Sequence, residues 1–226
     1  MASASKPVAI VVGVGPGLGA ALVRRFAKEG MSVALAARQG DRLAALAKEV
    51  GGRAYGCDAT IETAVDDLFA AVERDLGRPA IVVFNAGGYV RKPIAELSVS
   101  DVENTWRSNC LGGFLVGRAA ARAMQGAGKG TIIFTGATAA MRGGVNFAAF
   151  AMGKFGLRAL AQSMARELGP KGIHVAHTII DGGIGENAEA TKLSPDAIAD
   201  AYWHLHRQQK SAWTQELDLR PWAEKF

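Results

Sequence analysis

The stretch that decides the fold runs Val8-Ala9-Ile10-Val11-Val12-Gly13-Val14-Gly15-Pro16-Gly17-Leu18-Gly19. It opens with an apolar run rich in β-branched side chains, which is typical of a buried strand. After the glycines, Leu18, Leu22 and Phe26 recur at helical spacing until Gly30, a residue suited to end a helix. A strand, a glycine loop and a helix in this order predict the opening unit of an α/β nucleotide-binding fold.

The glycines of this loop are spaced for a dinucleotide. The common GxGxxG pattern would need glycine where Leu18 stands, but Gly13, Gly17 and Gly19 fit the spacing GxxxGxG. Glycines at a strand–helix junction let the backbone approach a pyrophosphate, which rests on the N-terminus of the helix. The loop therefore predicts cofactor contacts through Gly13, Gly15, Gly17, Leu18 and Gly19. A glycine-rich turn without a ligand is the alternative.

The same alternation of strand and helix continues along the chain. Further strands are expected at 32–37, 54–57, 80–84, 131–135 and 173–180. Helical periodicity falls between and after them, within 17–27, 43–50, 65–72, 102–124, 147–168 and 195–206. This order indicates βαβ crossovers, so we expect a Rossmann fold, with a doubly wound parallel sheet of about seven strands and helices on both faces. Residues 1–226 are expected to form a single domain, with the apolar tail 211–226 packed on the body or on another subunit.

Composition argues against several classes of function. The chain has 226 residues, 49% of them hydrophobic, which is enough for one substantial core. Its net charge of +5 is compatible with binding nucleic acid. However, the basic residues are scattered among acidic ones, so no nucleic-acid partner is expected. Two cysteines without metal-ligand spacing predict reduced thiols, no metal and a cytoplasmic location. The apolar run 7–23 contains four glycines and an internal proline, so no membrane span is expected.

The end of the second predicted strand bears on the choice of cofactor. NAD sites place Asp or Glu there to bind the ribose 2′-hydroxyl, whereas NADP sites offer an arginine to the 2′-phosphate. This strand ends in two alanines followed directly by Arg38. The sequence therefore favours NADP(H) over NAD(H), with a solvated arginine at a strand end as the alternative.

Further motifs downstream, taken together with the glycine loop, carry a family resemblance. They are Cys57-Asp58-Ala59, Phe84-Asn85-Ala86-Gly87 and Asn109 within residues 107–114. With these motifs in this order, the chain resembles the short-chain dehydrogenase/reductase family over essentially its whole length. The resemblance implies that Asp58 contacts the adenine and that Asn109 supports a water-linked proton relay. It also implies a cofactor site that includes Asp58, Ala59, Asn85, Ala86 and Gly87.

The residues expected to react depart from the pattern of that family. Its members use a Ser, a Tyr and a Lys four residues after the Tyr. Lys154 is present here, and the resemblance implies that it grips the nicotinamide ribose, but the Tyr position holds Phe150. The Ser position holds Ala137, with Thr138 beside it. We therefore expect an intact cofactor site in which both hydroxyls of the catalytic pair are replaced.

Another departure follows the strand expected at 173–180. The family carries Pro-Gly there, and then an apolar residue whose backbone meets the cofactor carboxamide. Here Asp181 stands in or near the proline position, and Ile184 is implied to be the apolar residue. The last helix begins near Pro195, which leaves little chain for a substrate lid. The site is therefore expected to be open, or to be closed by a partner chain.

The remaining polar side chains offer candidates for the proton step. Tyr89 is a replacement donor or a rim aromatic, and Thr138 replaces the serine hydrogen bond if the backbone shifts slightly. Asp181 is a base, a water ligand or a turn residue that caps nearby amides. His177 on an apolar strand is expected to be a satisfied core histidine, and His204 and His206 on the last helix to be solvated or at an interface.

These observations support two different functions. The first is an NADP(H)-dependent oxidoreductase that acts on a small carbonyl, alcohol or imine-like substrate with an altered proton step, and Asn109 and Lys154 favour it. The second is a catalytically silent nucleotide-binding homologue that senses cofactor or acts as a scaffold. In the family, the helices that match 102–124 and 147–168 pair across a subunit interface. The resemblance thus implies a homodimer or homotetramer.

Overall fold

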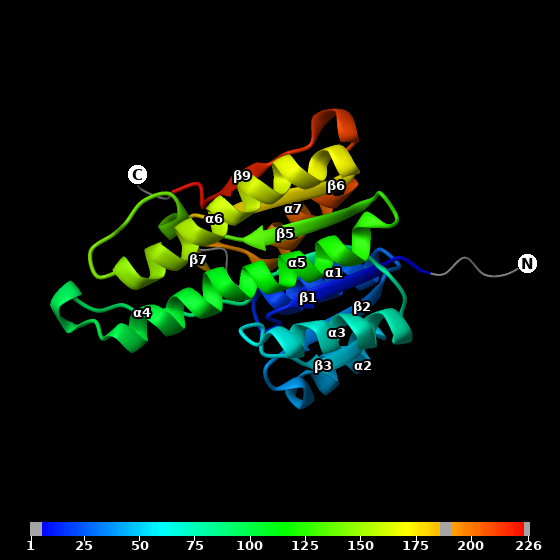
Figure 1. Cartoon of the computed structure of the whole chain (residues 1–226), viewed down its shortest axis with the longest axis horizontal. Helices are drawn as coiled ribbons and strands as arrows, with labels where there is room; N and C mark the ends of the chain where they lie inside the picture. The colour runs from blue at the N-terminus through cyan, green and yellow to red at the C-terminus, as the bar shows by residue number, and fades with distance from the viewer. Residues whose placement is uncertain (1–5, 186–190, 224–226) are drawn as a thin grey trace, which may run out of the picture.

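A computed structural model describes residues 6–185 and 191–223. Its centre is a sheet of seven parallel strands in the order β3-β2-β1-β4-β5-β6-β9, and Figure 1 shows how the helices lie around it. The strands are β1 (Val8–Val12), β2 (Ser32–Ala37), β3 (Arg53–Gly56), β4 (Pro79–Phe84), β5 (Gly130–Thr135), β6 (Ile173–Ile180) and β9 (Glu216–Leu219). Two short strands, β7 (Gly183–Ile184) and β8 (Lys192–Leu193), form a separate parallel pair. The prediction of a doubly wound parallel sheet is confirmed.

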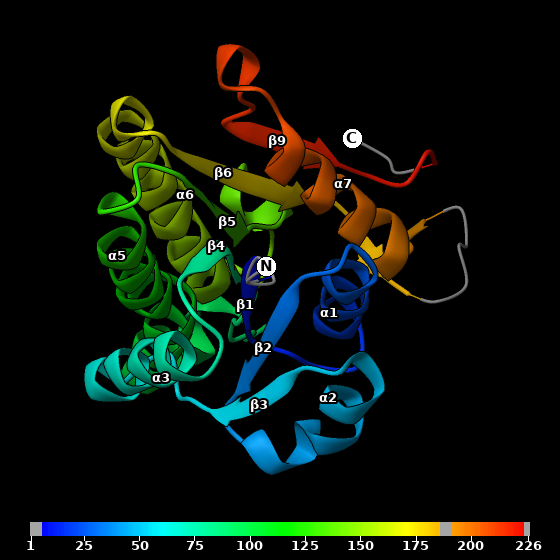
Figure 2. The same cartoon turned by 90° about the vertical axis from the view of Figure 1, so that its right-hand side faces the viewer.

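Helices cover both faces of the sheet, as Figure 2 shows from the end of the molecule. One face carries α1 (Leu18–Lys28), α2 (Ala44–Val50) and α7 (Pro195–Arg207). The other carries α3 (Glu62–Asp75), α5 (Gly112–Gln125) and α6 (Ala148–Leu168). The helix expected over 102–124 is α4 (Val99–Trp106) joined to α5 by a π-helical turn at Arg107–Leu111. Such turns occur mainly at functional sites, and this one holds Asn109.

The core divides along the strands, because successive side chains of a strand point to opposite faces. In β1, Ile10 and Val12 join the hydrophobic cluster under α3, α5 and α6. Ala9 and Val11 join the second cluster, under α1, α2 and α7. Every residue of β1 is buried, which is why the strand reads as a continuous apolar run rather than an alternating one.

The strand order reverses beside β1, and this places the functional region. The chain passes from β1 through β2 to β3 on one side, and then returns to β4 on the other side of β1. In sheets of this kind, ligands bind at that reversal, beyond the carboxyl ends of the strands. Gly13 lies there with φ of 94°, and a Cβ on it would stand 2.3 Å from the backbone nitrogen of Ala86. Only glycine fits this position.

The C-terminal tail forms part of the sheet. β9 pairs in parallel with β6, with Glu216 opposite His177 and Leu219 opposite Ile180. The tail therefore packs on the body, one of the two outcomes expected, and supplies the last of the seven strands. Its side chains are half-buried or exposed, as befits an edge strand. The last three residues of the expected tail, 224–226, lie outside the described residues.

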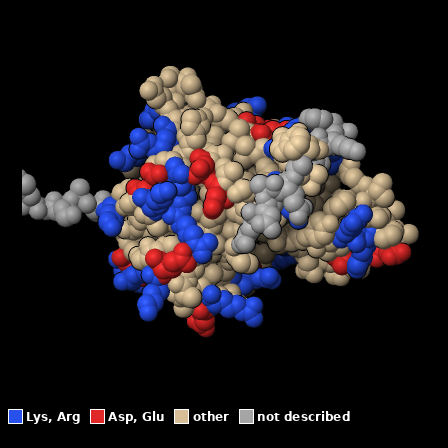
Figure 3. All heavy atoms as spheres, turned by 180° about the vertical axis from the view of Figure 1, so that it is seen from behind, with Lys and Arg blue, Asp and Glu red and all other residues tan. Residues whose placement is uncertain are grey.

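Two further properties concern the surface. No helix in the part of the chain that the structure describes is long and apolar enough to cross a membrane. Figure 3 shows basic and acidic side chains interleaved on the face opposite that of Figure 1. Ion pairs such as Arg24–Glu49 and Arg25–Asp200 account for part of that interleaving.

Candidate functional site

Two adjoining hollows open at the carboxyl edge of the sheet. The first, here the long hollow, has a volume of about 600 Å³ and runs from the β1–α1 loop past the ends of β2 and β3. The second, here the inner pocket, has a volume of about 550 Å³ and lies between β4, β5, β6 and α6. Both are lined by Asn85, Gly87, Gly88 and Tyr89, so they meet at the end of β4. Together they make a continuous site at the strand-order reversal.

The β1–α1 loop forms one wall of the long hollow. Gly13 and Gly15 line it, whereas Leu18 and Gly19 are buried at the start of α1. A Cβ on Gly15 or Gly17 would meet none of the described residues within 4 Å, so the space beside both is open to them. Within the described part of the chain, no side chain caps the N-terminus of α1. An open backbone cradle beside an uncapped helix terminus is the arrangement that binds a pyrophosphate.

The far end of the long hollow carries charge. Asp58 accepts hydrogen bonds from the backbone nitrogen and the hydroxyl of Thr60, at 2.9 and 2.8 Å. Burial acts to raise the pKa of Asp58, but these bonds and the charges of Arg38 and Arg107 outweigh it and hold the pKa below its usual value. Arg38 is exposed and lines the long hollow together with Ala59.

A neighbouring surface hollow adds a second arginine beside Arg38. It is lined by both Arg38 and Arg42. Sequence reasoning missed Arg42, because Arg38 lies in a bend after β2 and Arg42 in a short 3-10 helix, so no regular periodicity pairs them. Two arginines at one end of the long hollow form a region suited to an added phosphate.

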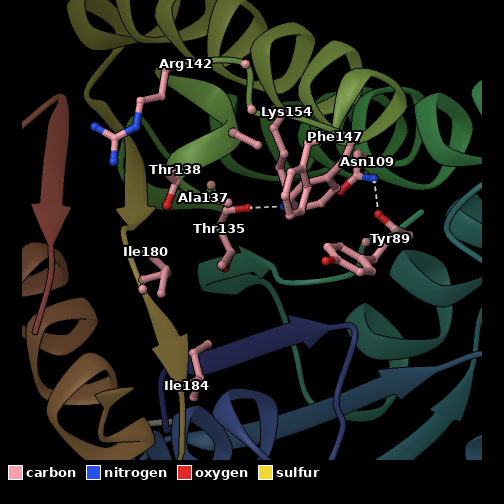
Figure 4. Close-up of a pocket in the computed structure, with 18 of the residues that line it drawn as sticks. Tyr89, Asn109, Thr135, Ala137, Thr138, Arg142, Phe147, Lys154, Ile180 and Ile184 are labelled. Atoms are coloured by element: carbon pink, nitrogen blue, oxygen red, sulfur yellow. Dashed lines mark hydrogen bonds between the residues drawn. The ribbon is translucent and has the colours of Figure 1, made fainter. Parts of the chain in front are cut away.

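Lys154 and Asn109 meet where the two hollows join. Lys154 is 6% exposed, and its Nζ donates to the carbonyl oxygen of Thr135 at 2.8 Å. Burial lowers the pKa of Lys154 to about 8. Asn109 Nδ2 donates to the carbonyl oxygens of Gly88 and Thr105, each at 2.8 Å. Figure 4 draws the bond from Lys154 to Thr135 and a bond from the Asn109 amide as dashed lines.

The carbonyl oxygen of Asn109 is buried and has no partner among the described residues. A Cβ built on Gly87 would lie 2.8 Å from this oxygen and 3.7 Å from Lys154 Nζ. An acceptor and a cation thus approach the same glycine-lined point. Orphaned buried acceptors usually mark the place of a water or ligand, so the residues present fit a cofactor ribose with its bound water.

Phe150 and Ala137 both line the inner pocket. Phe150 lies on α6 one turn before Lys154, whose Nζ is 5.7 Å from the centre of its ring. Tyr89 packs edge-on against Phe150 and Phe147, with ring centres 5.3 and 5.8 Å apart. In Figure 4 the Tyr89 hydroxyl points toward the interior of the pocket. The pocket thus has one aromatic side.

On the other side of the pocket, two of the predicted residues bind each other. Thr138 lines the pocket, and its Oγ1 donates to Asp181 Oδ1 at 2.5 Å. Asp181 is 5% exposed and stands behind Thr138, at the end of β6. Two arginines face its carboxylate, Arg142 at 3.9 Å and Arg220 at 3.5 Å. Sequence reasoning missed both arginines, because only the fold brings them to Asp181.

The expectation of a satisfied core histidine is half right. His177 is 1% exposed, as expected, but neither ring nitrogen has a partner among the described residues. Its pKa falls to about 4, chiefly through burial. His206 was expected to be solvated or at an interface, but it is half-buried and its Nδ1 is 2.9 Å from Thr131 Oγ1. Helix α7 brings His206 against the sheet, which its position in the sequence did not reveal.

The loop after β6 contributes partly to the pocket. Ile184, on β7, is exposed and lines the inner pocket with Ile180 and Gly182. Residues 186–190 of the short connection to α7 lie outside the described residues. Tyr202 of α7 is fully buried beneath the site, and its hydroxyl hydrogen-bonds with Thr135 Oγ1 and Thr178 Oγ1. It supports the end of β5, where the Thr135 carbonyl oxygen accepts the hydrogen bond of Lys154, and it does not line the pocket.

Comparison with known proteins agrees with this architecture. A model of the short chain dehydrogenase family matches residues 7–196. D-threitol dehydrogenase of Mycolicibacterium smegmatis is 32% identical over 173 residues, which are 74% of this chain and 66% of that protein. A solved short-chain dehydrogenase from Rhodopseudomonas palustris is 44% identical, with a TM-score of 0.87 over 95% of this chain and 98% of that one. An alcohol dehydrogenase from Thermococcus sibiricus, complexed with 5-hydroxy-NADP, is 26% identical with a TM-score of 0.89 over 98% and 99%.

The chain belongs to the short-chain dehydrogenase family, as the resemblance of its motifs implied. The curated relative is matched over just under two thirds of its own length.

Proposed function

We propose that the protein is an NADP(H)-dependent oxidoreductase acting on a small carbonyl, alcohol or imine-like substrate. The observation that carries the proposal is the meeting of Lys154 Nζ and the unpartnered Asn109 Oδ1 beside Gly87. A buried ammonium and a buried free acceptor are costly unless a ligand or water completes them. Both face the junction of the two hollows, where the reacting end of a bound dinucleotide would lie.

The proposed cofactor contacts follow the long hollow. Gly13, Gly15, Gly17, Leu18 and Gly19 would hold the pyrophosphate, and Asp58 and Ala59 the adenine end. Asn85, Ala86 and Gly87 would lie along the middle, Lys154 would bind the nicotinamide ribose, and the backbone of Ile184 would meet the carboxamide. When bound, NADP(H) supplies or accepts a hydride. The protein contributes orientation, exclusion of water and a path for the proton.

The preference for NADP(H) rests on Arg38. It is exposed at the end of the long hollow, and Arg42 lines the adjoining hollow beside it. No acidic residue follows β2 at this point to accept a 2′-hydroxyl. Two guanidinium groups favour a 2′-phosphate over a hydroxyl. A related solved structure contains an NADP analogue, which supports the same preference.

The proton step is proposed to be atypical. Phe150 and Ala137 offer no hydroxyl where the family pattern has Tyr and Ser, so the candidate groups are Tyr89, Thr138 and Asp181. Loss of a general acid lowers a rate by about a hundred- to ten-thousand-fold without abolishing it. The same two replacements favour a second candidate, a nucleotide-binding homologue without turnover.

Fluorescence titration with NADPH and then NADH tests the proposal. We expect NADPH to bind and NADH to bind at least about tenfold more weakly, because the phosphate adds charge-assisted hydrogen bonds. Arg38→Gln should remove most of this difference, and Arg166→Gln, which changes an exposed arginine of α6, should leave it unchanged. Failure of the wild type to bind either cofactor would refute the proposed function.

We also propose a homodimer or homotetramer in the cytoplasm. Large apolar side chains of α4, α5 and α6 are exposed on the chain, namely Trp106, Phe114, Met152 and Phe155. Exposed apolar side chains of this size commonly mark an interface, and the family resemblance points to these helices. The two free cysteines, Cys57 and Cys110, fit a reducing compartment.

A further inference from the structure

The hydroxyl groups of the inner pocket differ in what they already bind. Among its described lining residues, hydroxyls come from Tyr89, Thr135 and Thr138. The Thr135 hydroxyl is taken by the buried Tyr202, at 2.9 Å. Tyr89 is 60% exposed on the rim. Thr138 alone of the three is hydrogen-bonded to a carboxylate, that of Asp181.

We propose that Thr138 and Asp181 form the proton-transfer pair of this site, and that the pair serves an alcohol whose body is apolar or aromatic. The inference rests on the proposed function, since it assigns the proton path of that reaction. Thr138 would touch the substrate, and Asp181 would act through it. The hydroxyl and carboxylate of this pair, on the opposite wall of the pocket, would take the role of the tyrosine that the family pattern has at the position of Phe150 on α6.

The direction of the Thr138 hydrogen bond carries the argument. Because the Thr138 hydroxyl donates to Asp181 at 2.5 Å, its oxygen can offer only lone pairs to the pocket. A substrate group that meets this oxygen must therefore donate. An alcohol O–H donates, whereas a ketone or an ether oxygen does not. The geometry thus selects the alcohol state of a substrate for the Thr138 contact.

A backbone hydrogen bond and two arginines fix the position of Asp181, the second residue of the proposed proton-transfer pair. Its backbone nitrogen donates to the carbonyl oxygen of Leu219 at 2.8 Å, which ties it to β9. Arg142 and Arg220 face the carboxylate from two elements and offset the cost of burying its charge. Arg220 also pairs with Asp218, so its charge is shared between two carboxylates.

The proposed oxidation of the alcohol is balanced in protons and electrons. In the oxidation direction, the alcohol O–H bond breaks and its proton moves to Thr138 Oγ1, while the Thr138 proton moves to Asp181 Oδ1. A bound oxidised nicotinamide would accept the electron pair of the substrate C–H bond as hydride, and the carbonyl would form. Asp181 then releases its proton to water. Reduction follows the same path in reverse.

The remaining lining residues fit this substrate class. Lys154 and Arg142 bring positive charge to the pocket, which favours the oxyanion character that an alcohol gains as it loses its proton. Phe147, Phe150 and Ile180 form an apolar lining for the body of the substrate. A cationic substrate would face two like charges in the same pocket.

The first test measures binding without any cofactor. The probes are α-phenylethanol, its methyl ether and acetophenone, which share a body and differ in their ability to donate. We expect the alcohol to bind the wild type about tenfold more tightly than the other two, and Thr138→Val to remove that preference while Thr138→Ser keeps it. Equal binding of alcohol and ether, or binding of none of the probes, would overturn the inference.

The second test separates catalysis from structure. With α-phenylethanol and NADP⁺, we expect Thr138→Val and Asp181→Asn to lower kcat about a hundredfold, with KM for the alcohol little changed in Asp181→Asn. Thr138→Ser should recover most of the rate. Asp200→Asn, a carboxylate of α7 paired with Arg25, is the control. Wild-type kcat in both variants would overturn the pair even if NADPH binds normally, whereas lack of NADPH binding by the wild type would instead refute the proposed function.

Discussion

Burial, more than any neighbouring charge, sets the titration of His177 and Lys154. His177 has no hydrogen-bond partner among the described residues, and burial lowers its pKa to about 4. Burial also lowers the pKa of Lys154, to about 8. Each group binds fewer protons in the folded than in the unfolded chain between its two pKa values, so each makes folding more favourable as pH rises through that window. The cost of burying His177 therefore grows as pH falls below about 6.5, whereas that of Lys154 is already fully present below about pH 8.

The histidine gives a direct test at the scale of one residue. The unfolded pKa of His177 is near 6.5 and the folded one about 4, so stability is lost as pH falls through that window. We expect His177→Leu to raise the free energy of unfolding at any pH, since it removes unpartnered buried nitrogens, and by roughly 2 kcal/mol more at about pH 5 than at about pH 8. Urea unfolding at both values measures this, with His204→Leu, an exposed position on α7, as control. An equal gain at the two pH values would contradict it.

At the scale of elements, the β1–α1 junction separates two roles of glycine. Gly13 has φ of 94°, and a Cβ there would lie 2.3 Å from the Ala86 nitrogen, whereas a Cβ on Gly17 would meet nothing within 4 Å. We expect Gly13→Ala to destabilise the protein by about 2 kcal/mol or more, and Gly17→Ala to change stability by less than about 0.5 kcal/mol.

For NADPH affinity, Gly17→Ala is the more informative of the two variants. The methyl group of Gly17→Ala would occupy the space proposed for the pyrophosphate, so NADPH affinity should fall while the melting temperature holds. Thermal unfolding and an NADPH titration of both variants provide the two measurements. Full NADPH affinity in Gly17→Ala would remove this loop from the proposed cofactor site.

Local pattern was enough to predict most elements, but not the pairing between them. β6 was expected at 173–180 and lies there, because a long apolar run has few other outcomes. β9 was missed, because an edge strand in which Glu216 and Asp218 alternate with leucines lacks the apolar run that marks a central strand. The π-helical turn around Asn109 was missed too, since its residues are ordinary helix residues. The Thr138–Asp181 bond joins residues 43 positions apart, and only the order of β5 and β6 brings them together.

For the whole molecule, the tail ties the last edge of the sheet to the inner pocket. Arg158 of α6 pairs with Glu216 of β9 at 2.7 Å, and Arg220, just beyond β9, faces Asp181. The tail thus closes the edge of β6 and also supports the pocket wall. On the surface formed by α4, α5 and α6, large aromatic and methionine side chains are exposed.

These exposed side chains of α4, α5 and α6 lead to a prediction about the oligomeric state of the protein. Trp106 and Phe114 come from the α4–α5 helix, and Met152 and Phe155 from α6, and all four are exposed. They are the side chains that the proposed homo-oligomer would bury. We expect light scattering to give at least twice the chain mass, and Met152→Glu with Phe155→Glu to give the monomer, because buried unpaired carboxylates cost several kcal/mol. Val145→Glu is the matched control, since it adds a carboxylate at an exposed apolar side chain outside these helices. A monomeric wild type at working concentration would contradict the assembly and leave these side chains to another partner, and a dimer that survives both charges would move the interface elsewhere.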